Sequence, residues 1–218
     1  MSFDIDSYRL AATPVAYRDL DYSAFASRPL SRGALRCLRY MCDIESHTIC
    51  YLRDLLVTPS HADPQVTTFL TMWAYEEYWH GEALAAVLDA HGVPTDEAHI
   101  RTLRTRLGWR DRLSPIRQAV AANVVGTDFV AVHMTFGAIN EWSTHAGYAR
   151  LSAIENHPVL SELLGRIMRQ ETRHLLQFLL GDDTGRRAIG HIDEKIDGLP
   201  GLAGLNLVSR AATGYGIG

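Results

Sequence analysis

Two Glu-x-x-His motifs are the residues of this chain best suited to bind a metal ion. They are Glu77-Tyr78-Trp79-His80 and Glu171-Thr172-Arg173-His174. Because residues three apart lie on one face of a helix, the carboxylate and the imidazole of each motif can reach a common ion. One such motif is weak evidence, since chance spacing can produce it. Two motifs predict a shared site if the chain brings them to the same height.

A further glutamate, Glu45, lies on a helical pattern that precedes the first motif. In two antiparallel helices, residues equally far from the turn lie at the same height. The residue midway between Glu45 and Glu77 is His61, inside a turn bounded by Pro59 and Pro64. Each glutamate therefore stands roughly 23 Å along its helix from that turn, at 1.5 Å per residue.

The second half of the chain repeats this arrangement. Glu141 and Glu171 have Asn156 as their midpoint, inside the turn Glu155–Pro158. This pair also stands roughly 23 Å from its turn. We therefore predict that the four glutamates and the two motif histidines meet in one layer of a helical bundle.

Four glutamates and two histidines in one layer are the ligand set of a dimetal carboxylate site. Two divalent cations would offset the cost of burying four carboxylates. Mixed carboxylate and imidazole ligation favours iron or manganese over zinc. The competing interpretation, solvated glutamates beside ordinary histidines, does not explain the joint spacing. We predict two iron ions, with manganese or a mixed manganese–iron pair as the alternative, held by Glu45, Glu77, His80, Glu141, Glu171 and His174.

Neighbouring side chains are candidates for supporting roles. Glu76 and Gln170 each precede a motif glutamate and either hydrogen-bond a ligand imidazole or are exposed polar positions. Thr144 lies one turn beyond Glu141, where its hydroxyl either faces bound oxygen or bonds its own backbone. His145 is better interpreted as a core or supporting histidine than as a seventh ligand. Three residues carry no spacing argument and are interpreted as structural: His47, His133 and Trp79.

Hydrophobic periodicity predicts four principal helices and no strands. Prolines and glycines mark their ends. The connections after the first and third helices are short, whereas Gly92–Ser114 is long enough to return along the bundle. One long crossover between two hairpins predicts an all-α, ferritin-like four-helix bundle with extra short helices. The helices are expected after Ser31 as far as the break at Thr58–Pro64, and over about Val66–His91, Pro115–Ile154 and Val159–Leu180.

The rest of the chain is expected to flank this bundle. Residues 1–30 show no clear period and are predicted to be an arm packed on the bundle, which spans 31–181. Residues 182–218 form a C-terminal extension with a short helix near 186–196 and a glycine-rich end.

Composition excludes several classes of partner. The chain has 218 residues, a net charge of −4 and 47% hydrophobic residues, typical of one globular domain. Its arginines are scattered, and the densest run, Arg101–Arg106, is interpreted as a solvated face or as a docking patch for an acidic partner. The mild net negative charge and the scattered arginines argue against nucleic acid as the main partner. We expect no membrane span or secretory signal, and a cytoplasmic protein with three buried free thiols, Cys37, Cys42 and Cys50.

Three segments around the ligands carry a resemblance to a known family. Tyr75–Leu84 reads YEEYWHGEAL and resembles the E-E-x-x-H-G-[DE]-x-L stretch of soluble acyl-carrier-protein desaturases. Phe136 with Asn140–Thr144 resembles that family's F-x-E-x-x-T helix with one or two residues of slippage, and Glu171–His174 fits its E-x-R-H motif. The resemblance covers about residues 35–180. The chain is shorter than plant desaturases, and Gln170 replaces an acidic residue tied to electron delivery.

The resemblance implies O2 activation at a di-iron centre held by the six ligands, with Thr144 as a proton donor near bound oxygen. It also implies a channel for an aliphatic chain, for which Gly137 and Ala138 leave room, and a homodimer. The expected protein is an oxidase that desaturates or hydroxylates a fatty acyl or similar aliphatic substrate, free or bound to acyl carrier protein. An external donor such as ferredoxin would supply electrons.

Other functions stay open on the sequence. An iron-handling or peroxide-scavenging protein of the ferritin or rubrerythrin kind is one, although the Cys-x-x-Cys module usual in rubrerythrins is absent. An aldehyde-deformylating oxygenase, which has a similar ligand set and size, is another. A non-catalytic helical module is disfavoured by the aligned carboxylates.

Overall fold

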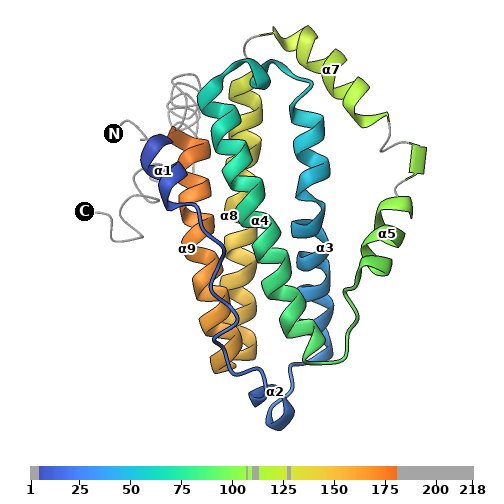
Figure 1. Ribbon diagram of the computed structural model, residues 1–218, viewed down its shortest axis with the longest axis vertical. Helices are drawn as coiled ribbons and strands as arrows, with labels where there is room; N and C mark the ends of the chain where they lie inside the picture. Colours follow the sequence, from blue (N-terminus) through green and yellow to red (C-terminus); the bar gives the residue numbers. More distant parts are fainter. Residues whose placement is uncertain (1–4, 107, 110–112, 127–128, 181–218) are drawn as a thin grey trace, which may run out of the picture.

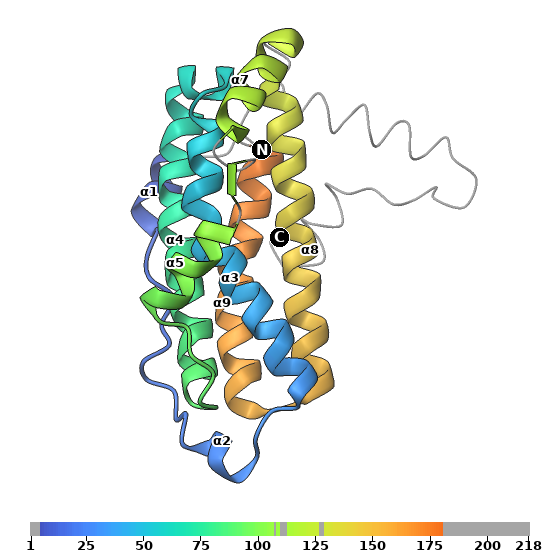
Figure 2. The same cartoon turned by 90° about the vertical axis from the view of Figure 1, so that its right-hand side faces the viewer.

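The fold is all-α in the residues that the computed structural model describes, 5–106, 108–109, 113–126 and 129–180 (Figure 1). Four long helices run side by side, as Figure 2 also shows. They pack chiefly as two antiparallel hairpins, α3 with α4 and α8 with α9. Their bounds are Arg32–Leu55 for α3, Pro64–Asp89 for α4, Phe129–Glu155 for α8 and Pro158–Leu180 for α9.

Capping residues fix where the first two long helices begin. The side chain of Ser31 accepts a hydrogen bond from the backbone N–H of Ala34 and starts α3. Asp63 accepts from the N–H groups of Gln65 and Val66 and starts α4. The short 3₁₀ helix η1 (Pro59–Ala62) fills the turn between them. Both predicted short turns are confirmed, so each glutamate pair is equidistant from its turn.

The predicted single helix over Pro115–Ile154 is wrong. Two helices cover this range, α7 (Ser114–Val125) and α8, and α7 ends at Gly126, whose φ of +74° favours glycine. Apolar residues continue on both sides of the break, so the hydrophobic pattern did not reveal it. The crossover therefore extends beyond Ser114. It includes α5 (Glu97–Arg106) and α7, and it leads from the end of α4 to the opposite end of the bundle (Figure 1).

The N-terminal arm lies along the bundle and includes α1 (Ile5–Ala11) and α2 (Ala24–Ser27). Helix α1 packs on α4, and the side chains of Tyr8 and Phe25 are buried. The predicted C-terminal extension, 182–218, and its short helix lie outside the described residues. Of the helices that the structure describes, none has the length and apolarity of a membrane span.

Two apolar clusters fill the bundle, one on each side of the ligand layer. The cluster towards α2 contains Leu38, Leu84 and Leu163. The cluster towards η1 contains Phe69 and Phe178. Along α4 and α9 the Glu-x-x-His motifs fall between the residues of the two clusters, so packing fixes the height of the layer from both sides.

The cysteine prediction is confirmed in part. All three cysteines are free, but only Cys42 is buried, whereas Cys37 and Cys50 are half-buried. The Cys42 thiol donates to the backbone oxygen of Gly81.

Candidate metal centre

The structure brings all six predicted ligands together in the interior, each with at most 5% of its surface exposed. They form two overlapping groups within which one ligand atom of each residue lies within 4.8 Å of the others. Glu77 and Glu171 belong to both groups. Such buried clusters of carboxylates and imidazoles could hold a metal ion. The groups are Glu45, Glu77, His80 and Glu171, and Glu77, Glu141, Glu171 and His174.

Both imidazoles direct Nδ1 into the centre. Nδ1 of His80 lies 3.4 Å from Oε1 of Glu171 and 3.8 Å from Oε1 of Glu77. Nδ1 of His174 lies 2.9 Å from Oε1 of Glu77, 3.3 Å from Oε2 of Glu171 and 3.4 Å from Oε2 of Glu141. The glutamate and the histidine of both motifs therefore face the same small volume.

Three of these inward-facing atoms have only the ion-pair contacts given above and no well-aligned hydrogen bond in the described part of the chain. They are Oε1 of Glu77, Nδ1 of His80 and Oε1 of Glu171, all buried. Buried polar atoms are nearly always satisfied in native proteins. A pair of divalent cations would satisfy them and balance the four carboxylates, so the donor set fits the predicted metal.

A hydrogen-bond network determines which nitrogen of His80 carries its proton. The side-chain Nε2 of Gln170 donates to the backbone oxygen of Thr13 at 2.9 Å and to Oε1 of Glu76 at 3.2 Å. Both of these partners accept only, so Oε1 of Gln170 must be the atom 2.8 Å from Nε2 of His80. His80 therefore donates through Nε2, which leaves Nδ1 to bind a cation.

Glu76 determines the same orientation for His174. Its Oε2 accepts from Nε2 of His174 at 2.9 Å and from the hydroxyl of Tyr8 at 3.3 Å. Its Oε1 accepts from Arg173 at 2.5 Å and from the N–H of Thr13 at 3.3 Å. Burial opposes the charge, but His174 and Arg173 lower the pKa of Glu76 below its usual value. The expected hydrogen bonds between these two residues and the ligand imidazoles are present. Glu76 accepts from His174 of the second motif, and Gln170 accepts from His80 of the first.

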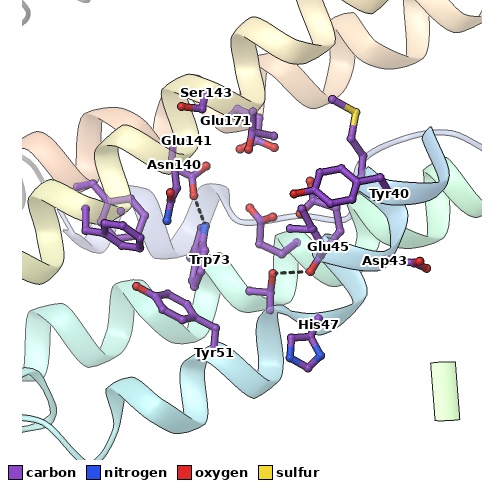
Figure 3. Close-up of a pocket in the computed structure, with 18 of the residues that line it drawn as sticks. Tyr40, Asp43, Glu45, His47, Tyr51, Trp73, Asn140, Glu141, Ser143 and Glu171 are labelled. Carbon is purple, nitrogen blue, oxygen red and sulfur yellow. Dashed lines mark hydrogen bonds between the residues drawn. The ribbon is translucent and has the colours of Figure 1, made fainter. Parts of the chain in front are cut away.

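Two donors that the sequence analysis missed hold the unshared carboxylates. The hydroxyl of Tyr148 donates to Oε1 of Glu45 at 2.6 Å. The indole N–H of Trp73 donates to Oε1 of Glu141 at 3.0 Å (Figure 3). Helical spacing could have identified both. Tyr148 lies two turns after Glu141, and Trp73 lies one turn before Glu77.

Without a bound cation, protons occupy the centre. Burial and the neighbouring Glu77 raise the pKa of Glu45, and burial and Glu171 raise the pKa of Glu141. Burial disfavours the charged form of His80, but Glu171 and Glu77 outweigh it and raise its pKa to about 10. A proton and a cation would therefore compete for Nδ1 of His80.

The pKa values of the two shared carboxylates, by contrast, are lowered. Burial and the charge of Glu77 raise the pKa of Glu171, but bonds with Glu141, His174 and His80 outweigh them and lower it to about 2. Burial also raises the pKa of Glu77, but its contacts with Glu45, His174 and His80 outweigh burial and lower that pKa well below its usual value. The two carboxylates common to both groups are therefore the ones whose pKa is lowered.

A cavity of about 660 Å³ opens beside the carboxylates and is lined mainly by α3 and α8 (Figure 3). All four ligand glutamates reach it, whereas its described wall includes neither ligand imidazole. Most of the remaining lining is aromatic or apolar, with a few hydroxyl and amide groups on α8. The apolar and aromatic side chains include Met41, Ile44, Tyr51, Trp73, Phe136 and Phe178, and those on α8 with a hydroxyl or amide are Asn140, Ser143 and Thr144. The lining also includes Asp43, His47 and Thr48 of α3.

The structure separates the weaker sequence candidates. Thr144 lines the cavity, and His47 also lines it. His145 is half-buried and belongs to neither ligand group. His133 is buried away from the ligands, where its Nδ1 lies 2.9 Å from the hydroxyl of Ser60 and burial lowers its pKa to about 4.

The remaining candidates lie in packed surroundings. Trp79 packs against the core cluster on the α2 side, and Arg18 lies over its ring at 5.9 Å. Gly137 lines the cavity, and the ring of Phe178 fills the space beside it, because an added Cβ would lie 2.2 Å from that ring. Ala138 packs in the core cluster towards η1.

Comparison of the chain with protein-family models, curated proteins and solved structures gave no match.

Proposed function

We propose that this chain is a ferritin-like dimetal carboxylate protein that binds two iron ions and uses O2 to oxidise an aliphatic substrate. The observation that carries the proposal is the sharing of Glu77 and Glu171 between two buried ligand groups. A site for one cation would need no such sharing. A reduced iron pair, when bound, would supply electrons to O2. The reduction of O2 would in turn provide the oxidising power to remove hydrogen from an unactivated C–H bond.

The protein's part is to hold the ligands and to admit the substrate. The cavity is within the size range of small-molecule sites, roughly 300–1,000 Å³, and its aromatic and aliphatic walls favour an acyl or similar chain. Its contact with the carboxylates would place that chain beside the metal pair. Thr144 lines the same cavity one turn from Glu141, which supports a role for its hydroxyl in delivering a proton there.

The position and charge of helix α5 favour a substrate that is attached to an acidic carrier protein. Leu103 of α5 lines the cavity, and Arg101, Arg104 and Arg106 on the same helix are exposed. Cations beside the opening would favour the approach of an acidic partner.

Anaerobic reconstitution with Fe²⁺ tests the proposal. We expect two iron ions per chain by elemental analysis. Exposure to O2 and reductant with acyl-carrier-protein-linked and free fatty acids should give a product that has lost two hydrogens or gained one oxygen, read by mass spectrometry. O2 consumption without an organic product would favour an iron-handling or peroxide-scavenging protein. Failure to bind iron or manganese would overturn the dimetal site.

A further inference from the structure

The two ligand imidazoles differ in the group that each one bonds on its far side. Nε2 of His174 donates to a carboxylate, Glu76, at 2.9 Å. Nε2 of His80 donates to a neutral amide, Gln170, at 2.8 Å. The two hydrogen bonds are nearly equal in length, and both imidazoles are fully buried. The difference is therefore one of charge.

Two other features are common to the two proposed cation positions. Both positions share Glu77 and Glu171. The unshared carboxylate of each position accepts from one neutral donor, Tyr148 in one case and Trp73 in the other. The main asymmetry of the site is thus that a carboxylate, Glu76, bonds His174, whereas an amide, Gln170, bonds His80.

A carboxylate behind an imidazole makes the opposite nitrogen a better metal ligand. The negative charge favours electron density at Nδ1, and changes to such outer hydrogen bonds typically alter metal affinity by about 10- to 100-fold. Arg173 bonds Oε1 of Glu76, which leaves Oε2 directed at His174. The arginine therefore fixes the orientation of the carboxylate without displacing His174.

We propose that the two metal positions are inequivalent, and that the position of His174 and Glu141 binds the first divalent cation because Glu76 supports its imidazole. The inference rests on the proposed dimetal function. It assigns Glu76 and Gln170 as positioning residues that set the order of metal binding.

Anaerobic calorimetric titration with Co²⁺ tests this order. Two separate steps in the unmodified protein would not suffice, because neighbouring cations repel each other at any pair of positions. Single variants identify the position instead. His80→Ala should keep the tighter step, and His174→Ala should keep only a step about 10-fold weaker. Equal affinities in the two variants would overturn the inference.

An exchange of the two supporting residues provides the matched control. Glu76 and Gln170 contact each other at 3.2 Å, so the double variant Glu76→Gln/Gln170→Glu keeps the same groups and total charge in the network. In this background the tighter step should survive His174→Ala and be lost in His80→Ala. An unchanged order would overturn the inference.

A second measurement leaves Glu76 and Gln170 unchanged. With one equivalent of Co²⁺, proton NMR of the unmodified protein should show one strongly shifted imidazole Nε2–H signal, belonging to His174. Its absence from the spectrum of His174→Ala identifies it. A shifted His80 signal of equal intensity would overturn the inference. If the unmodified protein binds no Co²⁺, the dimetal function itself fails, which is a different outcome.

Discussion

The two sides of the ligand layer are built differently. On the arm side, behind the imidazoles, Glu76 accepts hydrogen bonds from five groups, and residues 8–13 of the arm close over it. On the cavity side, Glu45 and Glu141 each accept one hydrogen bond from a side chain and border open space. One side holds its ligands through a satisfied polar network, whereas the other leaves room for a ligand to approach the carboxylates.

The proposed function needs two tasks, orientation of the ligands and admission of a substrate, and these fall to different sides of the ligand layer. Rigid partners behind the imidazoles fix their tautomers and directions before a metal arrives. A cavity beside the carboxylates admits a substrate without disturbing those partners. Variants on the two sides should therefore have different effects, on stability for the arm side and on turnover for the cavity side.

Loss of a shared ligand should have the largest effect, because it removes the centre on which both sides depend. Glu171→Ala is expected to abolish binding of both metal ions, measured as metal per chain after reconstitution. Glu162→Ala is the matched control on the same helix, where the carboxylate is exposed and pairs with Arg166. Retention of two ions by Glu171→Ala would contradict the shared geometry.

Loss of Glu76 should destabilise the metal-free protein. Glu76→Ala leaves His174 and Arg173 without their carboxylate, and the breaking of a buried ion pair typically costs about 3–5 kcal/mol. Urea denaturation at neutral pH measures the change. Glu82→Ala on the same helix removes an exposed carboxylate and should leave stability nearly unchanged. Equal effects of the two variants would mean that the network does not hold the arm side together.

Loss of the Thr144 hydroxyl should affect turnover alone. Thr144→Val keeps the shape of the side chain, so we expect unchanged metal content and unfolding. The rate of O2-dependent product formation should fall by on the order of 100-fold if the hydroxyl delivers a proton. Ser143→Ala is the neighbouring control, because that hydroxyl donates to the backbone oxygen of Ile139. An equal rate in Thr144→Val and the unmodified protein would remove Thr144 from the mechanism.

The smallest expected effect is a pH dependence of the stability of the metal-free fold, which comes from His80. The pKa of His80 in the metal-free fold is about 10, above the value near 6.5 of an unfolded histidine. Its protonated form therefore stabilises the metal-free fold fully below pH ~6.5, and this contribution is lost as pH rises through about 10.

A cation at Nδ1 of His80 must displace this proton. Co²⁺ binding near pH 7 should release protons, and calorimetric heats in buffers of different ionisation enthalpy measure their number. His80→Ala should release about one fewer. The contribution of His80 should disappear above pH 10. Equal release by both proteins would show that His80 does not exchange its proton for the metal.

The ligand layer could be predicted because helices convert sequence spacing into height. Both turns fell at the midpoints of glutamate pairs, and a rise of 1.5 Å per residue placed the six ligands together. The same regularity could have revealed Trp73 and Tyr148. The break at Gly126 was missed because apolar residues resume at Phe129, so that a single glycine is a weak stop signal inside the helical pattern.

The arm side could not be predicted from spacing. Tyr8 and Thr13 contact Glu76 across more than sixty positions of the chain, and no helical period connects them. The cavity depends equally on tertiary structure, because it lies where α3 and α8 pack less closely than the helices of each hairpin.

The contact between Gln170 and Thr13 joins the arm to the last long helix. It has a consequence for biosynthesis. Ligands lie on all four long helices, and the partner of His80 arrives only with α9, so no nascent chain that stops before this helix can complete either cation position. In the proposed dimetal protein, the metal ions are therefore expected to bind only after translation has passed His174.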